Sequence, residues 1–123
     1  MVVDDEKDVT ITYTQILQDD GFIVEAYNNP FEALEKFRES PEETYDMLLL
    51  DMMMPGMNGL ELYQEIQKSN KKVPKICFAT SYESFYNLLK QSFPEMDEKC
   101  FIRTPVSPRD LLTKLKQELQ KTI

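Results

Sequence analysis

Short apolar runs and stretches of helical periodicity alternate along the whole chain. Apolar or β-branched runs of strand length occur at 1–3, 22–27, 47–50, 73–79 and 99–103. Between them, apolar residues recur every three or four positions, which predicts helices over 7–20, 30–40, 60–69 and 82–93 and a last helix from 108 onward. Strands that alternate with helices predict an α/β, doubly wound fold: a single five-stranded parallel sheet with right-handed crossovers and helices on both faces.

Residues with strong helix-terminal preferences mark the ends of these helices. Gly21 follows the first helix, where its freedom to adopt a left-handed conformation suits a C-terminal cap. Asn29 precedes Pro30, and Ser107 precedes Pro108. This order places a capping side chain directly before a proline at the first helical position. It predicts that the second and last helices begin at these two prolines.

The totals are those of one acidic globular domain. The 123 residues suit a single substantial core, and a formal net charge of −8 disfavours direct binding to nucleic acid, which needs a face rich in Lys and Arg. The absence of His excludes catalysis by a histidine base or a histidine-ligated metal. We find no signal peptide and no apolar run of membrane length, so we expect a cytoplasmic protein without a membrane partner. Cys77 and Cys100 fall in apolar strands, where reduced core thiols are expected.

Polar side chains follow the predicted strands at their carboxyl ends, where open parallel sheets bind ligands. Asp4 and Asp5 follow the first strand, Asp51 the third, Thr80 the fourth, and the turn at Thr104–Pro105 the fifth. Three carboxylates that converge without a basic partner repel one another, so a bound cation is expected. Oxygen ligands favour Mg²⁺, which would neutralise charge while Asp51 attacks a phosphoryl group and the Thr80 hydroxyl donates to that group.

Each of these residues has an ordinary structural role when it is considered alone. An acidic pair before a helix caps the helix and complements its dipole. An Asp after a strand is a common turn former, and a Thr before a helix is a common N-cap. The aromatic stripe of the predicted helix over 82–93 is core or partner surface. The functional interpretation therefore depends on the coincidence of an acidic pair, an Asp and a Thr after the first, third and fourth strands.

Three motifs at these positions resemble those of the receiver domain of two-component response regulators. They are VVDDE at 2–6, LDMMMPGMNG at 50–59 and ATS at 79–81. The resemblance covers 1–123 as one receiver domain with no output domain, and it implies a flavodoxin-like fold with strand order 2-1-3-4-5. It also implies a signalling domain rather than an enzyme, although one that assists its own phosphoryl transfer and autodephosphorylation.

The resemblance assigns roles to residues at the strand ends. Asp51 would accept a phosphoryl group from the phosphohistidine of a sensor histidine kinase or a phosphotransfer protein. Asp5, Asp51 and the main-chain carbonyl of Met53 would bind Mg²⁺ directly, and Asp4 would act through a water molecule. Met53 and Tyr82 occupy positions that tune the lifetime of the phosphoryl group, and their bulk would shield it from water.

By the same resemblance, phosphorylation would change a partner-binding face. Thr80 would swing towards the phosphoryl group, and Phe101, at the aromatic switch position, would move inwards with it. The face made by the fourth helix, the fifth strand and the fifth helix would then bind a downstream protein, or a second copy of the chain as a homodimer. Such a switch is a two-state element that a local change of charge biases.

Thr104 is a departure from the family, which usually has a lysine at this position. That lysine would pair with Asp51 at rest and with the phosphoryl group afterwards, whereas Thr104 offers only a hydrogen bond. Arg103 is adjacent, but neighbouring residues of a strand point to opposite faces. Without the lysine, we expect self-repulsion to destabilise the metal-free domain and Mg²⁺ to raise its melting temperature.

Three other functions compete with that of a phosphorylated receiver domain. A receiver-like interaction module that works without phosphorylation is kept open by Thr104. A phosphatase of the haloacid dehalogenase type would need a second Asp where Met53 stands. A flavodoxin-like cofactor binder would need a phosphate loop rich in hydroxyls and glycine after the first strand, which the sequence lacks.

Overall fold

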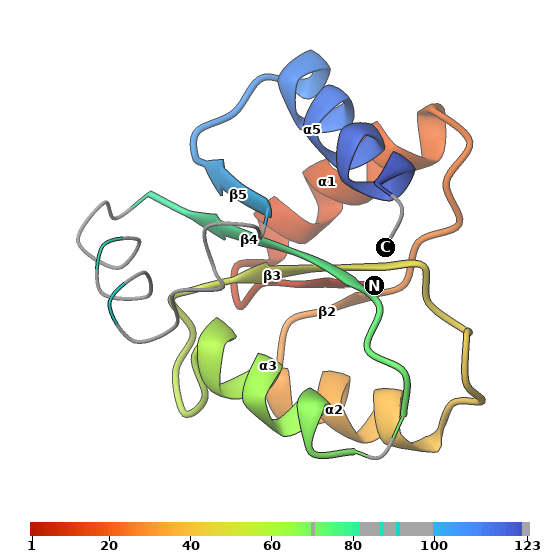
Figure 1. The fold of residues 1–123 in the computed structure, drawn as a ribbon. Coiled ribbons are helices and arrows are strands. Elements are labelled where there is room, and N and C mark those ends of the chain that lie inside the picture. The colour runs from red at the N-terminus through yellow and green to blue at the C-terminus, as the bar shows by residue number, and fades with distance from the viewer. Residues whose placement is uncertain (70, 82–86, 88–90, 92–99, 122–123) are drawn as a thin grey trace.

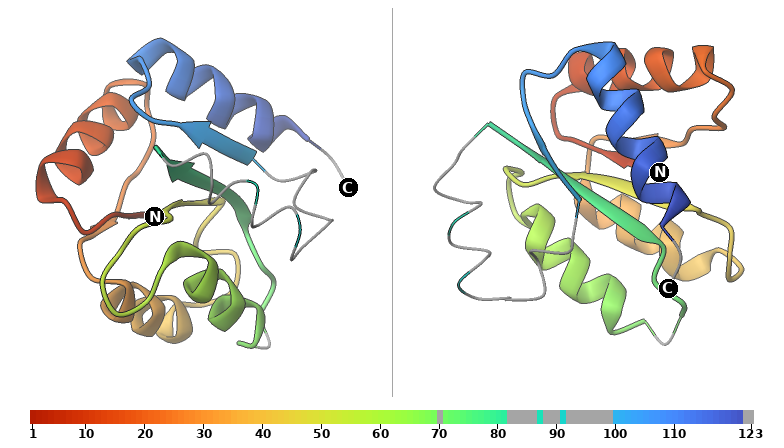
Figure 2. Two further views of the ribbon diagram at one scale, coloured as in Figure 1. Left: turned by 90° about the vertical axis from the view of Figure 1, so that its left-hand side faces the viewer. Right: turned by 45° about the horizontal axis from the view of Figure 1, so that its top comes forward.

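The computed structural model describes residues 1–69, 71–81, 87, 91 and 100–121. One parallel sheet has the strand order β2-β1-β3-β4-β5, with β1 (Val2–Val3), β2 (Ala26–Tyr27), β3 (Met47–Asp51), β4 (Lys75–Thr80) and β5 (Cys100–Arg103). The described helices are α1 (Lys7–Asp19), α2 (Pro30–Glu39), α3 (Gly59–Gln67) and α5 (Pro108–Gln120). Figure 1 shows α1 and α5 on one face of the sheet and α2 and α3 on the other, and Figure 2 shows the same layers from two further directions. The predicted flavodoxin-like fold is confirmed.

Part of the predicted fourth helix cannot be compared with the structure. The residues outside the described part of the chain include 82–86, 88–90 and 92–93. Tyr82, which the sequence analysis assigns to tuning the phosphoryl lifetime, is the first of them. Among the described helices, none combines the length and the apolar character that crossing a bilayer requires.

The second strand is shorter than the sequence predicts. β2 lies at the edge of the sheet, where Ala26–Tyr27 pairs with Val2–Val3. Because β1 supplies only two residues, 22–24 have no strand beside them in the described part of the chain. Ile23 is accordingly 99% exposed. The prediction of a strand over 22–27 is confirmed only for its last two residues.

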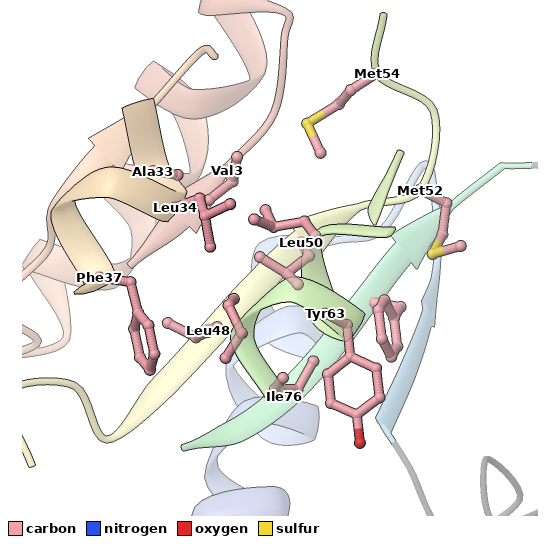
Figure 3. Packing of buried hydrophobic residues seen from close by; sticks show 13 residues of the cluster. Val3, Ala33, Leu34, Phe37, Leu48, Leu50, Met52, Met54, Tyr63 and Ile76 are labelled. Carbon is pink, nitrogen blue, oxygen red and sulfur yellow. The ribbon is translucent and has the colours of Figure 1, made fainter. Parts of the chain in front are cut away.

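Buried side chains form two clusters, one on each face of the sheet. Alternate residues of β3 point to opposite clusters, so Leu48 and Leu50 pack with α2 and α3 (Figure 3) while Leu49 packs with α1 and α5. In the first cluster, the ring of Tyr63 meets Phe78 edge-on, with centroids 5.7 Å apart. Because helices cover both faces, this strand has a continuous apolar sequence up to its polar end. The polar end is therefore the part of β3 that is available for chemistry.

The helix ends predicted at Gly21, Pro30 and Pro108 are confirmed. Gly21 has φ +93°, a conformation that favours glycine. Asn29 accepts hydrogen bonds from the first backbone N–H groups of α2, and Ser107 accepts one from the first turn of α5 at 3.1 Å. At α3, Asn58 and Glu61 form a reciprocal capping box with hydrogen bonds of 2.8 and 3.1 Å. This box starts α3 one residue earlier than periodicity predicts.

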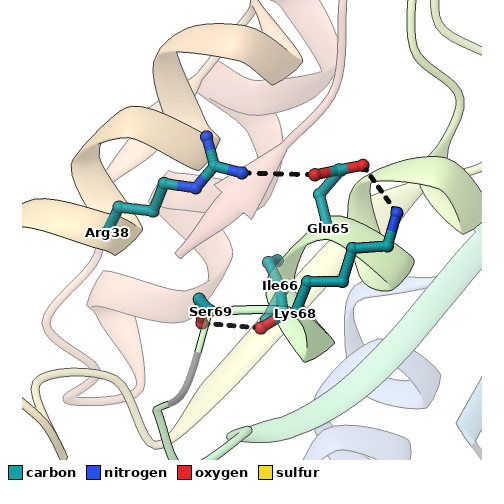
Figure 4. A network of polar contacts seen from close by, with 5 residues as sticks. All are labelled: Arg38, Glu65, Ile66, Lys68 and Ser69. Atoms are coloured by element: carbon teal, nitrogen blue, oxygen red, sulfur yellow. Dashed lines mark hydrogen bonds and ion pairs between the residues drawn. The ribbon is translucent and has the colours of Figure 1, made fainter.

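Polar contacts between α2 and α3 lie at the surface (Figure 4). Arg38 and Lys68 both form ion pairs with Glu65, at 3.2 and 3.3 Å. Exposed pairs of this kind contribute at most about 1 kcal/mol each. Lys71 instead donates to three carbonyl oxygens at the end of α2, where a positive charge complements the helix dipole. The Arg38–Glu65 pair joins the two helices, and these contacts lie away from the carboxyl ends of the strands.

Cys77 and Cys100 form a disulfide bond between β4 and β5. The two residues are directly opposite each other in the parallel register, their Cα atoms are 4.4 Å apart, and both side chains are fully buried. The expectation of two reduced core thiols is therefore wrong for this structure. The sequence places each cysteine in a strand, but it does not show that the two strands are neighbours in this register.

The disulfide predicts a definite pattern of thiol reactivity. Alkylation of the unfolded protein without a reductant should leave Cys77 and Cys100 unmodified, and prior reduction should make both reactive. Replacing both cysteines with Ala should lower the free energy of unfolding by about 2–4 kcal/mol, because the bond restricts the unfolded chain. Intact mass and urea unfolding measure the two effects, and two alkylated cysteines in unreduced protein would contradict the bond.

Candidate functional site

Three carboxylates meet at the carboxyl ends of β1 and β3. One oxygen atom from each of Asp4, Asp5 and Asp51 lies within 4.8 Å of the other two. Asp4 is buried, Asp51 is half-buried and Asp5 is exposed, so the cluster is open to solvent at Asp5. The structure thus brings together the three acidic residues that the sequence analysis places at this edge of the sheet.

The pairing of β1 with β3 sets this geometry. Val3 lies opposite Leu50, so the residues that follow them, Asp4 and Asp51, are neighbours at one edge of the sheet. The N–H of Glu6 donates to Oδ1 of Asp4 at 2.9 Å and closes the turn that leads into α1. One of the two carboxylate oxygens of Asp4 is therefore engaged within its own turn.

α3 begins directly against the end of β3. Gly59 donates its N–H to the carbonyl oxygen of Met52 at 3.3 Å. A Cβ atom at Gly59 would overlap the carbonyl oxygen of Asp51 and lie 3.1 Å from its carbonyl carbon, so only glycine permits this approach. The loop between the two elements borders an open hollow whose lining includes Asp5 and Met53. Asp51 is thus held between a buried strand and a helix N-terminus.

Burial and mutual repulsion disfavour the charged forms of these carboxyl groups. Burial is the largest cause that raises the pKa of Asp51 to about 7; the charge of Asp4 adds to it, and the backbone hydrogen bond from Met53 opposes it. Burial also raises the pKa of Asp4 to about 6, against the hydrogen bond from Glu6. A cation would favour the charged forms of both groups.

The ligand set fits a hard divalent cation. Mg²⁺ takes one or two carboxylates together with carbonyl and water oxygens. Acidic groups at a protein surface are common without a metal, but here Asp4 is buried and Asp51 half-buried beside it. Two carboxylates removed from water at this distance are charged together only beside a compensating cation, which makes the cluster a candidate metal site.

The two residues of the predicted switch lie on β4 and β5. Thr80 is the last residue of β4 and is buried, and its carbonyl oxygen accepts the N–H of Thr104 at 3.1 Å. Phe101 is half-buried and stacks on Phe78, with ring centroids 5.4 Å apart. The aromatic ring is therefore already in contact with the cluster beneath α2 and α3.

Thr104 occupies the position at which the resemblance implies a lysine. It is half-buried, and its peptide bond to Pro105 is cis. Arg103 is exposed and lies opposite Thr80 in the register of β4 and β5. Thr104 supplies no charge to the acidic cluster, and the charges that raise the pKa of Asp51 come from other carboxylates.

Three residues contribute to the site in ways that the sequence does not predict. Asn28 donates to the carbonyl oxygen of Asp4 at 2.9 Å, although its sequence position indicates only a turn. Thr10 is buried in α1, where the periodicity marks other residues as the core-facing stripe. Gly59 belongs to the recognised motif, but its close approach to Asp51 is visible only in three dimensions. A Thr in the first turn of the helix that follows the acidic turn is the signal that the sequence offers for Thr10.

Comparison with known proteins identifies the family of the chain. A family model, the response regulator receiver domain, matches residues 1–116. The chain belongs to the response regulator receiver family. This receiver domain is 33% identical over 122 residues to the transcriptional regulatory protein CpxR homolog of Haemophilus influenzae, with 99% of this chain and 50% of that protein covered. It is 30% identical over 121 residues to the transcriptional regulatory protein ResD of Bacillus subtilis, with 98% and 48% covered.

Solved structures show the same fold for this receiver domain. A CheY-like receiver domain protein from Methanospirillum hungatei is 32% identical with a TM-score of 0.78, covering 96% of this chain and 90% of that chain. The chemotaxis protein CheY4 of Vibrio cholerae is 27% identical with a TM-score of 0.79, covering 94% and 93%. The receiver domain spans about half the length of the curated relatives it matches.

Proposed function

We propose that this receiver domain takes a phosphoryl group onto Asp51 from the phosphohistidine of a sensor histidine kinase or a phosphotransfer protein. The observation that carries the proposal is the half-buried carboxylate of Asp51 at the end of β3, clustered with Asp4 and Asp5. A carboxylate in such a position is a competent nucleophile. The P–N bond breaks as the P–O bond to Asp51 forms, and the electron pair of the broken bond stays on the imidazole, which takes up a proton.

Mg²⁺ would be held by Asp5, Asp51 and the main-chain carbonyl of Met53, with Asp4 acting through a water molecule. It supplies neutralisation of charge and orientation of the phosphoryl oxygens when bound. The hydrogen bond that already engages one oxygen of Asp4 supports an indirect role for this residue. The side chain of Met53 is 41% exposed beside the hollow, which supports its role in shielding the phosphoryl group from water.

Thr80 and Phe101 would transmit the change of charge to a partner-binding face. Thr80 ends β4, the strand next to that of Asp51. Phe101 of β5 packs on Phe78 of β4, so β4 connects the acidic site to the aromatic ring. The face that includes β5 and α5 would then bind a downstream protein or a second copy of the chain. In this role the domain is a signalling module that assists its own phosphorylation and dephosphorylation.

A receiver-like module that works without phosphorylation is the second candidate function. Thr104 is the observation that favours it, because this residue cannot pair electrostatically with Asp51 or with a phosphoryl group. In such a module, the acidic cluster would bind Mg²⁺ for stability alone, and partner binding would not change when phosphoryl donors are added.

Intact mass after incubation with acetyl phosphate and Mg²⁺ separates the two functions. We expect one phosphoryl adduct, and none in the Asp51→Asn variant. Thr104→Lys should speed adduct formation about tenfold, because a cation beside the transferring group stabilises its developing charge. An unmodified protein that still binds Mg²⁺ would favour the phosphorylation-independent module. An adduct that persists in Asp51→Asn would place the phosphoryl group elsewhere.

A further inference from the structure

The side-chain amide of Asn28 joins three segments of the chain. From the loop after β2, its Nδ2 donates to the main-chain oxygen of Asp4 at 2.9 Å and to Oγ1 of Thr10 at 3.0 Å. Thr10 in turn donates its hydroxyl to the carbonyl oxygen of Lys7 at 2.9 Å. The series of bonds therefore links the loop after β2, the acidic turn after β1 and the first turn of α1.

These bonds hold the backbone on both sides of Asp5. On the N-terminal side of Asp5, the N–H of Asp4 donates to the carbonyl oxygen of Tyr27 at 3.1 Å. The carbonyl oxygen of Asp4 accepts the hydrogen bond from Nδ2 of Asn28. After Asp5, the first turn of α1 is tied to the same amide through Thr10. Asp5 itself is exposed, so its carboxylate is placed mainly by the backbone around it.

The position of these hydrogen bonds matters because the three carboxylates repel one another. Without a cation, repulsion favours a turn in which Asp4 and Asp5 move away from Asp51. Hydrogen bonds to Asp4 and α1 oppose that movement before any metal arrives, and a ligand set held in place loses less entropy on binding. Asn28 is exposed, whereas Thr10 is buried, so the amide can be removed without opening the core.

We propose that Asn28 is a positioning residue that pre-organises the Asp4–Asp5 turn for a divalent cation, with Thr10 as its support. The inference rests on the proposed metal site of the receiver domain. It assigns no contact between Asn28 and the cation; the amide acts through the backbone of Asp4.

The test is calorimetric titration of Mg²⁺ into metal-free protein. Asn28→Ala should raise the dissociation constant about fivefold, because it removes the hydrogen bond to the main-chain oxygen of Asp4 together with the one to Thr10. Thr10→Val keeps the side-chain shape and should raise it about threefold. The dissociation constant of the double variant should exceed that of either single variant. Its increase over the parent should be smaller than the product of the two single increases, because both side chains act in one network.

Thr12→Val is the matched control. Thr12 lies on the same helix and makes the same kind of bond, from its hydroxyl to the carbonyl oxygen of Asp8 at 2.9 Å, but at an exposed position outside the network. Its Mg²⁺ affinity should equal that of the parent. In phosphorylation by acetyl phosphate, Asn28→Ala should need more Mg²⁺ for half-maximal rate and reach the parental rate at saturation.

The outcomes distinguish the inference from the proposed function. A purely structural Asn28 would lower the melting temperature of metal-free Asn28→Ala and leave its Mg²⁺ affinity unchanged, which would overturn the inference alone. A parent protein that binds no Mg²⁺ would overturn the metal site and the inference together. If Asn28→Ala fails to fold by circular dichroism, Thr10→Val decides, since an unchanged affinity in that variant contradicts the network.

Discussion

Replacing Gly59 with Ala should lower the free energy of unfolding by about 2–3 kcal/mol. The new Cβ would overlap the carbonyl oxygen of Asp51 and lie 3.1 Å from both the carbonyl carbon of Asp51 and Cα of Met52. These are backbone atoms, so the overlap is relieved only if β3 and α3 separate. Helix propensity alone would favour Ala over Gly, by at most the value of about 1 kcal/mol for a helix interior, so a purely local effect would have the opposite sign.

Gly59→Ala should also weaken Mg²⁺ binding, because the backbone that has to move carries Asp51. Gly21→Ala is the matched control: Gly21 has φ +93°, but a Cβ there meets nothing within 4 Å, and it lies at the far end of α1 from the acidic turn. We expect it to cost about 1–2 kcal/mol and to leave Mg²⁺ affinity unchanged. Urea unfolding and calorimetry measure both properties. Parental stability and affinity in Gly59→Ala would show that α3 can move away from β3 at no cost.

The end of β3 shows why much of the site can be predicted from sequence. An apolar run that stops at a carboxylate requires only that the strand be buried on both faces, and parallel connections then bring the carboxyl ends of neighbouring strands together. The positions of Asp4, Asp5 and Asp51 follow from these two rules. The ends of α2 and α5 follow as well, because Asn and Ser before a proline define a helix start through local hydrogen bonds alone.

What sequence reasoning missed depends on how separate elements are placed against each other. The Cys77–Cys100 bond requires the register between β4 and β5, and strand patterns carry little information about register when both faces are apolar. The strand over 22–27 was predicted from β-branched and aromatic content, yet its length is limited by the two residues of β1. Asn28 looks like a turn residue until its amide is seen to reach Asp4.

Without metal, the stability of the domain should fall as the pH rises from about 4 to about 7. Burial, followed by repulsion from the other carboxylates, raises the pKa of Asp51 to about 7, and burial raises the pKa of Asp4 to about 6. In the unfolded chain both groups titrate near about 3.9. Over this interval the folded state holds protons that the unfolded chain has released, so the free energy of unfolding decreases with rising pH.

The amine of Met1 contributes in the opposite direction. Burial lowers its pKa to about 6, so between about pH 6 and 8 the unfolded chain holds more of this proton and stability rises with pH. A variant that changes Asp51 alone separates the two contributions to the pH dependence, because the amine of Met1 contributes equally to the stability of parent and variant. The difference between the two unfolding free energies then reports the carboxylate.

Asp51→Asn should therefore stabilise the metal-free protein at pH 7.5 by about 1–2 kcal/mol. This figure is smaller than the full pKa shift implies, because Asp51 is partly exposed and solvent screens its charge. At pH 4 the folded parent keeps Asp51 protonated, and the two proteins should differ by less than about 0.5 kcal/mol. Asp19→Asn, at an exposed position ending α1, is the control, because removing a charge at the carboxyl end of a helix should change stability by less than about 1 kcal/mol.

Excess Mg²⁺ should reverse this order of stability. A cation that binds only the folded parent at about 100 times its dissociation constant adds about 2.7 kcal/mol, whereas Asp51→Asn loses a charged ligand and gains less. Urea unfolding at pH 7.5 in EDTA and in Mg²⁺ measures all four values. If Asp51→Asn stays the more stable protein in Mg²⁺, Asp51 is not a metal ligand. If the two proteins are equally stable in EDTA, repulsion within the cluster costs the resting domain nothing, and the loss of the family's lysine at Thr104 has no consequence for its stability.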